Sequence, residues 1–192
     1  MLGMPLVSRS LPGQNRREMI ALDSNVVTYL VEAMTTGYDP ESDDDDRLRL
    51  ERISAMRVFL YVGNLFVTPT VIVELRKISE LESRQLHELV TLALLGELVH
   101  LDQHKVERRT QEFLSHHSKE QDCRILAEGE AGGVGRLLTF DSTLVTRLQA
   151  QTNVRIATAS TFWEEWALPQ GAPPRWEPVP TNPLATQDWW RW

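Results

Sequence analysis

Short apolar runs alternate with helical segments along this chain, and this alternation limits the possible fold more than any other feature. Runs that predict β-strands lie at residues 19–23, 64–70, 98–102, 135–141 and 153–158. Between them lie segments with apolar residues at helical spacing, for example Ile53, Met56 and Leu60. Strands that alternate with helices form parallel βαβ units. The sequence therefore predicts an α/β fold: a three-layer α/β/α sandwich with a central parallel sheet.

Breaker residues divide the chain into three parts. Residues 1–18 contain Pro5, Pro12 and Gly13, which predicts an irregular N-terminal arm. Residues 19–167 hold all the predicted strands, and a segment of this length fits one globular domain. Residues 168–192 contain six prolines and four tryptophans and can form neither a regular helix nor a central strand.

The tryptophans of the C-terminal tail, residues 168–192, are too apolar to remain exposed as a patch. We expect the tail to be ordered in an extended form, with Trp189, Trp190 and Trp192 as its anchors. The sequence leaves open whether these rings pack on their own domain or on a partner.

Composition excludes several classes of protein. The chain has 192 residues and a formal net charge of −7, so its overall charge does not favour non-specific binding to duplex DNA. Its single cysteine, Cys123, excludes an internal disulfide framework. No apolar run is long enough to span a membrane. These features predict a cytoplasmic protein with no membrane partner.

Four carboxylates stand where predicted strands end or helices begin. Asp23 ends the run Ile20 to Leu22, Glu74 lies early in the helix after "FVTPT", Asp122 begins "DCRILAEGE", and Asp141 ends "LLTFD". The ends of parallel strands meet at one edge of a sheet, so these side chains can converge. Converging carboxylates repel one another unless a cation lies between them. Oxygen ligands favour Mg²⁺ or Mn²⁺.

The same four motifs give the chain a resemblance to a known family. "LDSN", "TPTVIVELRKI", "DCRILAEGE" and "LLTFDSTL" resemble, in order and local context, the acidic motifs of PIN-domain ribonucleases, which include the VapC-type toxins. The resemblance covers about residues 19–166. It implies an Mg²⁺- or Mn²⁺-dependent endoribonuclease, with an RNA substrate, an antitoxin protein and a homodimer among its expected partners. The acidic loop near residues 37–46, the arm and the tail depart from the compact pattern of the family.

Each acidic residue then has an expected role. Asp23 and Asp122 would bind the metal directly, Glu74 directly or through water, and Asp141 would complete the site or hold a second metal. Three neighbours are expected to hydrogen-bond these ligands or their water: Ser24, Asn25 and Thr139. Asn25 has the alternative role of capping its helix.

Each of these residues also has a purely structural interpretation. Asp23 and Asp141 suit turns, Glu74 suits a helix dipole, and Asp122 suits an N-cap. We expect Glu128 and Glu130 to be solvated helix residues and residues 39–46 to form a solvated, mobile loop. The histidines, including His116 and His117, are expected at the surface or at the edge of the core.

Three other functions compete with the nuclease interpretation. A phosphatase of the haloacid-dehalogenase type needs a second aspartate at position 25, where this chain has Asn25. A receiver domain needs a lysine after a late strand, and "VRIATAST" has none. The main alternative is a catalytically inactive PIN-like module that binds protein or RNA.

Overall fold

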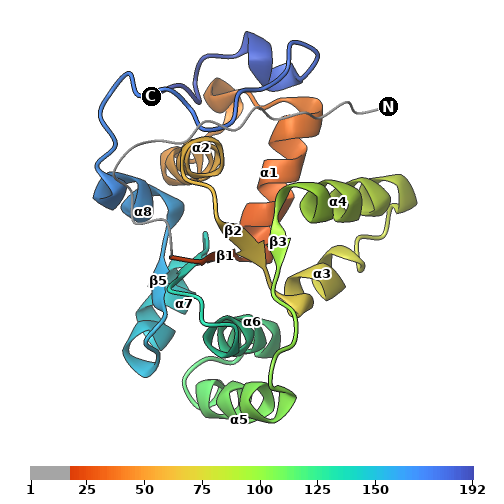
Figure 1. The fold of residues 1–192 in the computed structure, drawn as a ribbon, viewed down its shortest axis with the longest axis vertical. Coiled ribbons are helices and arrows are strands. Elements are labelled where there is room, and N and C mark those ends of the chain that lie inside the picture. The colour runs from red at the N-terminus through yellow and green to blue at the C-terminus, as the bar shows by residue number, and fades with distance from the viewer. Residues whose placement is uncertain (1–17) are drawn as a thin grey trace. The chain divides into compact units, whose positions relative to one another are not determined.

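The computed structural model describes residues 18–192, and its centre is a five-stranded, all-parallel β-sheet (Figure 1). The strands are β1 (Ile20–Leu22), β2 (Leu65–Val67), β3 (Gly96–Glu97), β4 (Arg136–Leu138) and β5 (Arg155–Ala157). They are hydrogen-bonded in the order β3-β2-β1-β4-β5. This confirms the predicted α/β class with its central parallel sheet in a three-layer α/β/α arrangement. The N-terminal arm expected over residues 1–18 lies almost wholly outside the described residues.

Eight α-helices occupy the segments around the strands in the described part of the chain. They are α1 (Ser24–Thr36), α2 (Asp46–Tyr61), α3 (Pro69–Leu75), α4 (Leu81–Leu94), α5 (Gln103–Leu114), α6 (Glu120–Ala131), α7 (Ser142–Leu148) and α8 (Ala159–Trp166). Three short 3₁₀ helices are η1 (Pro40–Ser42), η2 (Gln149–Gln151) and η3 (Pro183–Thr186).

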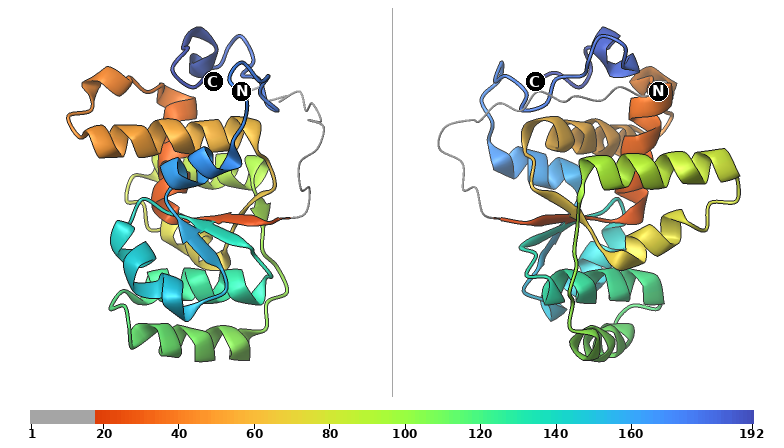
Figure 2. Two further views of the ribbon diagram at one scale, coloured as in Figure 1. Left: turned by 90° about the vertical axis from the view of Figure 1, so that its left-hand side faces the viewer. Right: turned by 45° about the vertical axis from the view of Figure 1, so that its right-hand side comes forward.

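The strand order places a change of direction at β1. β1 pairs with β2 on one side and with β4 on the other, with Ile20 aligned to Leu65 and to Arg136. The chain first moves outward from β1 to β3, then returns to β4 and moves outward to β5. Right-handed crossovers in opposite directions lie on opposite faces of a sheet. Accordingly, α4 lies on one side of the sheet and α5 and α6 lie on the other (Figures 1 and 2).

The described residues form two compact units, and the division falls within α1. One unit, which we call the sheet unit, comprises residues 18–28 and 64–158 and contains all five strands. The other, the tail unit, comprises residues 29–63 and 159–192. This grouping differs from the boundaries expected from the sequence, because residues 29–63 and 159–167 group with the tail rather than with the strands.

In the tail unit, aromatic rings fasten the C-terminal segment to α2 and α8. The indole of Trp192 packs edge-on against Trp163 with ring centroids 5.4 Å apart, and the guanidinium of Arg57 lies 4.9 Å from the Trp192 ring centre. Trp190 is 1% exposed and its Nε1 donates to the Leu184 carbonyl oxygen at 2.8 Å. The tail therefore packs on its own chain, which answers the question that the sequence left open.

The acidic loop is ordered, contrary to the expectation of a mobile segment. Asp39 caps η1, and Asp45 caps α2 by accepting from the backbone N–H groups of Arg47 and Leu48. Asp43 forms an ion pair with Arg52 at 3.0 Å. The loop's acids are mostly exposed, as expected, but Asp39 and Asp45 also cap helix N-termini, where the positive end of the dipole favours them.

The third strand also lies earlier than predicted. Residues 98–102 were expected to form it, yet β3 is Gly96–Glu97, which pairs with Phe66 and Val67. A Cβ at position 96 would lie 2.6 Å from the Phe66 ring, so any other residue there would require the ring to move. His100 has a φ of 59°, which ends the extended conformation that "LVHLD" predicted.

Candidate metal centre

Asp23 lies at the point where the sheet changes direction, directly after β1. Its backbone N–H donates to the Leu138 carbonyl oxygen of β4 at 2.9 Å, which aligns the two strand ends. The side chain is only 3% exposed. Ligands of open parallel sheets bind in the crevice outside the carboxyl ends of the strands at such a switch point. Asp23 therefore occupies the position where a functional carboxylate is expected.

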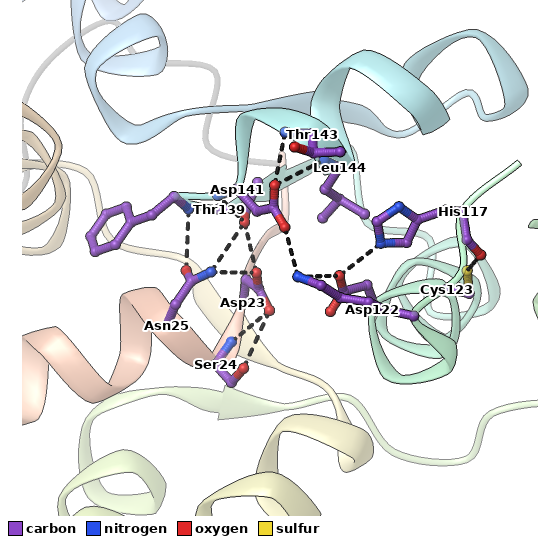
Figure 3. A network of polar contacts seen from close by, with 12 residues as sticks. Asp23, Ser24, Asn25, His117, Asp122, Cys123, Thr139, Asp141, Thr143 and Leu144 are labelled. Carbon is purple, nitrogen blue, oxygen red and sulfur yellow. Dashed lines mark hydrogen bonds and ion pairs between the residues drawn. The ribbon is translucent and has the colours of Figure 1, made fainter. Parts of the chain in front are cut away.

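Three polar neighbours fix both oxygens of Asp23 (Figure 3). Oδ1 accepts from the Ser24 backbone N–H at 2.8 Å. Oδ2 accepts from Asn25 Nδ2 at 2.9 Å and from the Thr139 hydroxyl at 2.6 Å. Ser24, Asn25 and Thr139 are the three residues that the sequence placed around the acidic site, and all three contact Asp23.

Asn25 and Thr139 also connect the turn after β1 with the turn after β4. Asn25 Oδ1 accepts from the Phe140 backbone N–H at 3.2 Å. The Thr139 hydroxyl, which donates to Asp23, accepts from the Asp141 backbone N–H at 3.0 Å. Thr139 is fully buried. One hydroxyl thus sets the positions of Asp23 and of the backbone that carries Asp141.

Burial raises the pKa of Asp23 to about 6, although its hydrogen bonds from Thr139 and Ser24 act in the opposite direction. The charges of Asp122 and Glu74 raise it further. Such an effect requires that both carboxylates lie near Asp23. A buried aspartate with two neighbouring carboxylates gains most from a cation that would keep all of them ionised.

Asp122 and Asp141 lie beside Asp23 but come from two different helices (Figure 3). Asp122 is in the first turn of α6, where the sequence had placed it at the helix start itself. Asp141 is the N-cap of α7 and accepts from the Thr143 and Leu144 backbone N–H groups at 2.8 and 3.2 Å. β4 ends at Leu138, so Asp141 follows the strand by a short turn instead of ending it.

A lysine joins these two carboxylates. Lys119 Nζ lies 2.9 Å from Asp141 Oδ2 and 3.6 Å from Asp122 Oδ2. Burial acts to raise the pKa of Asp141, but Lys119 and the two backbone N–H groups outweigh it, so the pKa is lowered. The bridge therefore stabilises the ionised form of Asp141.

A buried histidine holds Asp122 from the other side. His117 is 3% exposed, and its Nε2 lies 2.9 Å from Asp122 Oδ2. A hydrogen bond to a carboxylate places the proton of a neutral imidazole on Nε2. Because His117 is buried, the expectation of a surface or core-edge histidine is wrong here, and the ring instead orients an acidic residue.

Glu74 approaches the same region from α3, and a buried glutamate anchors the start of that helix. Glu74 is half-buried and near enough to Asp23 for its charge to raise the pKa there. Glu128, on α6, is 2% exposed and accepts from the Thr70 backbone N–H at 2.9 Å and the Thr70 hydroxyl at 2.8 Å. The expectation that Glu128 is solvated is therefore wrong, because it binds the N-terminus of α3. Glu130 is half-buried and ion-paired with Arg109 at 2.7 Å, so it is not a solvated residue either.

The four predicted carboxylates are thus brought to one end of the sheet, but they are not drawn into a tight cluster. Among residues 18–192, no group of three or more His, Cys, Asp or Glu side chains is placed closely enough to hold a metal ion. Lys119 takes part of the space that a cation shared by Asp122 and Asp141 would need.

Sequence reasoning missed His117, Lys119 and Glu128. His117 and Lys119 lie just before α6, and their proximity in sequence to Asp122 was a usable signal. Glu128 gave no such signal, because its partner Thr70 is distant in the sequence.

Comparisons with known proteins add no assignment to this geometry. No protein-family model matches the chain, and a search of curated proteins finds no match to it. No helix among residues 18–192 is long and apolar enough to cross a membrane.

Proposed function

We propose that this protein is a metal-dependent endoribonuclease that hydrolyses RNA phosphodiester bonds with Mg²⁺ or Mn²⁺ at its acidic site. The observation that carries the proposal is Asp23: a buried carboxylate at the switch point of a parallel sheet, with the charges of Asp122 and Glu74 acting on it. The resemblance of the four acidic motifs to those of PIN-domain ribonucleases supports the same reaction.

The donor atoms of the acidic site suit a hard divalent cation, although the side chains would have to move closer together to hold one. Asp23, Asp122 and Asp141 would hold it directly, and Glu74 directly or through water. All the donors are carboxylate oxygens, which favour Mg²⁺ and Mn²⁺ over zinc. The raised pKa of Asp23 fits as well, because a bound cation would return this group to its ionised form. When bound, the metal would polarise a phosphoryl oxygen and activate a water.

The chain's own residues would orient the reacting groups. Thr139 and Asn25 occupy Asp23 Oδ2, so Oδ1, which accepts from the Ser24 backbone N–H, is the oxygen with remaining capacity for a metal. His117 fixes Asp122 Oδ2 in the same way. Hydrogen bonds of this kind hold a ligand in one geometry and preserve its charge, which is the usual function of residues that surround metal ligands.

The partners belong to the proposal as well. RNA is the substrate class that the resemblance to PIN-domain ribonucleases implies. We propose a cytoplasmic setting, an antitoxin protein as inhibitor and a homodimer as the working form. A small reading frame beside the gene that encodes a DNA-binding N-terminus would support the toxin role.

Cleavage of a generic RNA tests the function directly. The wild-type protein should cleave it with Mn²⁺ or Mg²⁺, and EDTA should stop the reaction. The double variant Asp23→Asn, Asp122→Asn should lose at least about a thousandfold, because metal ligation is the main electrostatic contribution to the transition state. Asp44→Asn, which removes an exposed acid of the loop, is the matched control and should keep full activity. Equal cleavage by wild type and double variant would reject the proposal.

An inactive PIN-like binding module is the second candidate. The Lys119 bridge favours it, because an ammonium already lies between two of the four carboxylates and offsets part of their charge without any metal. If this candidate is right, the purified protein will bind RNA or a protein partner in EDTA as tightly as in Mn²⁺ and will cleave nothing in either.

A further inference from the structure

Lys119 is placed as a removable cation between two carboxylates of the acidic site. Its ammonium contacts Asp141 Oδ2 at 2.9 Å and Asp122 Oδ2 at 3.6 Å. Asp141 is the N-cap of α7 and Asp122 lies in α6 (Figure 3). Two carboxylates that both contact one ammonium lie close enough to repel each other if nothing positive lies between them. In the metal-free protein, the lysine therefore reduces the repulsion between these two carboxylates, as a divalent ion would.

The lysine is also able to leave. Its side chain is 61% exposed, in contrast to 17% for Asp122 and 22% for Asp141. Residue 119 is the N-cap position of α6, with an extended backbone and no capping hydrogen bond from its side chain. Moving the ammonium into water would therefore break its contacts with the two carboxylates but no capping hydrogen bond of α6, and a lysine side chain is flexible.

The remaining contacts of the two acids do not depend on Lys119. His117 holds Asp122 Oδ2, and the N-terminus of α7 holds Asp141 Oδ1. If the ammonium departed, both carboxylates would remain anchored and Asp141 Oδ2 would be free. The site can thus exchange one cation for another while its ligands stay in place.

We propose that Lys119 is an internal counter-cation that competes with the divalent metal for Asp122 and Asp141, and that moves to a phosphate oxygen of the RNA when metal binds. This inference rests on the proposed function, because it takes the two carboxylates as metal ligands. It assigns Lys119 two effects: it weakens metal binding, and it strengthens RNA binding to the metal-loaded protein.

Two variants separate the effect of the charge of the Lys119 side chain from the effect of its length. Lys119→Met keeps the length of the side chain and removes its charge, and Lys119→Arg keeps the charge. The chain has only two other lysines, and Lys105→Met removes one exposed charge on α5 as the matched control. None of these changes alters a proposed metal ligand.

Mn²⁺ affinity, measured by titration calorimetry without RNA, is the first readout. Lys119→Met should bind Mn²⁺ about 3- to 10-fold more tightly than wild type, a range set by the modest strength of exposed ion pairs and the double charge of the metal. Lys119→Arg and Lys105→Met should bind within twofold of wild type. A structural role for Lys119 alone would not raise metal affinity.

RNA cleavage at saturating Mn²⁺ is the second readout. Lys119→Met should raise KM for RNA by about 3- to 10-fold while kcat changes less, because one phosphate contact is lost. Measurable Mn²⁺ binding that is equal or weaker in Lys119→Met overturns this inference and leaves the nuclease proposal standing. Absence of Mn²⁺ binding in every variant, with no cleavage, overturns both.

Discussion

Asp23 connects the strand order of the sheet to the electrostatics of the acidic site. Its backbone is fixed by β1 and by the hydrogen bond to Leu138, and its carboxylate is fixed by Ser24, Asn25 and Thr139. Burial of such a group stabilises its neutral form unless a cation is present. The same residue therefore affects the stability of the metal-free protein and, under the proposed function, would also affect its affinity for metal.

Stability of the metal-free protein should fall as the pH rises from about 4 to about 6. The pKa of Asp23 is about 6 in the folded protein and 3.8 for the ordinary group, so the folded state binds the proton more tightly. Its contribution to stability is complete below the lower value and is lost as the pH rises through the higher one, by roughly 3 kcal/mol.

Urea unfolding of wild type and Asp23→Asn across pH 4–7 measures this effect. The difference between the two curves should change over the window in EDTA and change less in Mg²⁺, because a bound cation favours the ionised carboxylate. Parallel curves in EDTA would contradict the assignment of the raised pKa to Asp23.

Removing the Thr139 hydroxyl should weaken the site without opening a cavity. Thr139→Val loses the hydrogen bond to Asp23 and leaves the Asp141 backbone N–H without its acceptor. We expect a loss of about 1–3 kcal/mol in unfolding free energy and about tenfold in RNA cleavage. Thr146→Val, at an exposed position of α7, is the control and should change neither quantity appreciably. Equal effects of the two substitutions would show that the hydroxyl does not position Asp23.

At the scale of elements, buried carboxylates stabilise the N-termini of two short helices. α3 has only seven residues, and its N-terminus is held by Glu128 of α6 through the Thr70 backbone N–H and hydroxyl. The tail unit has a similar arrangement, in which the buried Glu51 of α2 accepts from the Ser160 backbone N–H and hydroxyl at the start of α8. In both cases a carboxylate satisfies N–H groups that a helix leaves unpaired.

Glu128→Gln should therefore destabilise the protein by about 1–3 kcal/mol. The carboxylate accepts from both the backbone N–H and the hydroxyl of Thr70, whereas an amide has one accepting oxygen and no negative charge. Because α3 carries Glu74, the substitution should also lower metal-dependent activity. Glu107→Gln, on α5 and 59% exposed, should stay within about 0.5 kcal/mol of wild type. Urea unfolding measures both variants, and equal stability of the two would contradict the anchoring role of Glu128.

The sequence predicted most elements because their signals are local. Thr68 followed by Pro69 marked the start of α3, and Gly132 and Gly133 marked the end of α6, where Gly133 has a φ of 74°. β3 was misplaced because its position depends on the fit of Gly96 against Phe66, a contact between strands. Local patterns do not contain such contacts.

The acidic site, like the fold, could be predicted from the sequence only in part. The order of Asp23, Glu74, Asp122 and Asp141 along the chain was sufficient to place them at one edge of a parallel sheet. The Lys119 bridge and the burial of His117 depend on how the segment before α6 folds over Asp122, and the closeness of these residues in sequence does not by itself determine that path. The sequence therefore predicted the acids and the residues that orient Asp23, but not Lys119 and His117, which contact Asp122.

At the scale of the whole molecule, the tail unit and the site are expected to be energetically separable. The four carboxylates all belong to the sheet unit, and the tail's anchors all belong to the tail unit. Deletion of residues 170–192 should therefore reduce stability and solubility while leaving Mn²⁺ affinity within about twofold of wild type. Loss of Mn²⁺ binding upon deletion would contradict this separation.

Substitutions of single tryptophans should show how much each ring contributes to the stability of the packed tail. Trp190→Ala, at a side chain that is 1% exposed, should cost about 3–5 kcal/mol of unfolding free energy. Trp192→Ala, at a side chain that is 38% exposed, should cost less. Chemical unfolding followed by far-ultraviolet circular dichroism measures both, and an equal or reversed order would contradict the packing described for the tail.

The central claim is that Asp23, Asp122 and Asp141 hold a divalent cation, and anomalous diffraction from crystals soaked in Mn²⁺ tests it most directly. The claim predicts an anomalous peak beside β1 and β4, about 2.1 Å from carboxylate oxygens of these three residues, and its loss in Asp23→Asn. A map with no peak there at saturating Mn²⁺, with Lys119 still bound between Asp122 and Asp141, would contradict the claim.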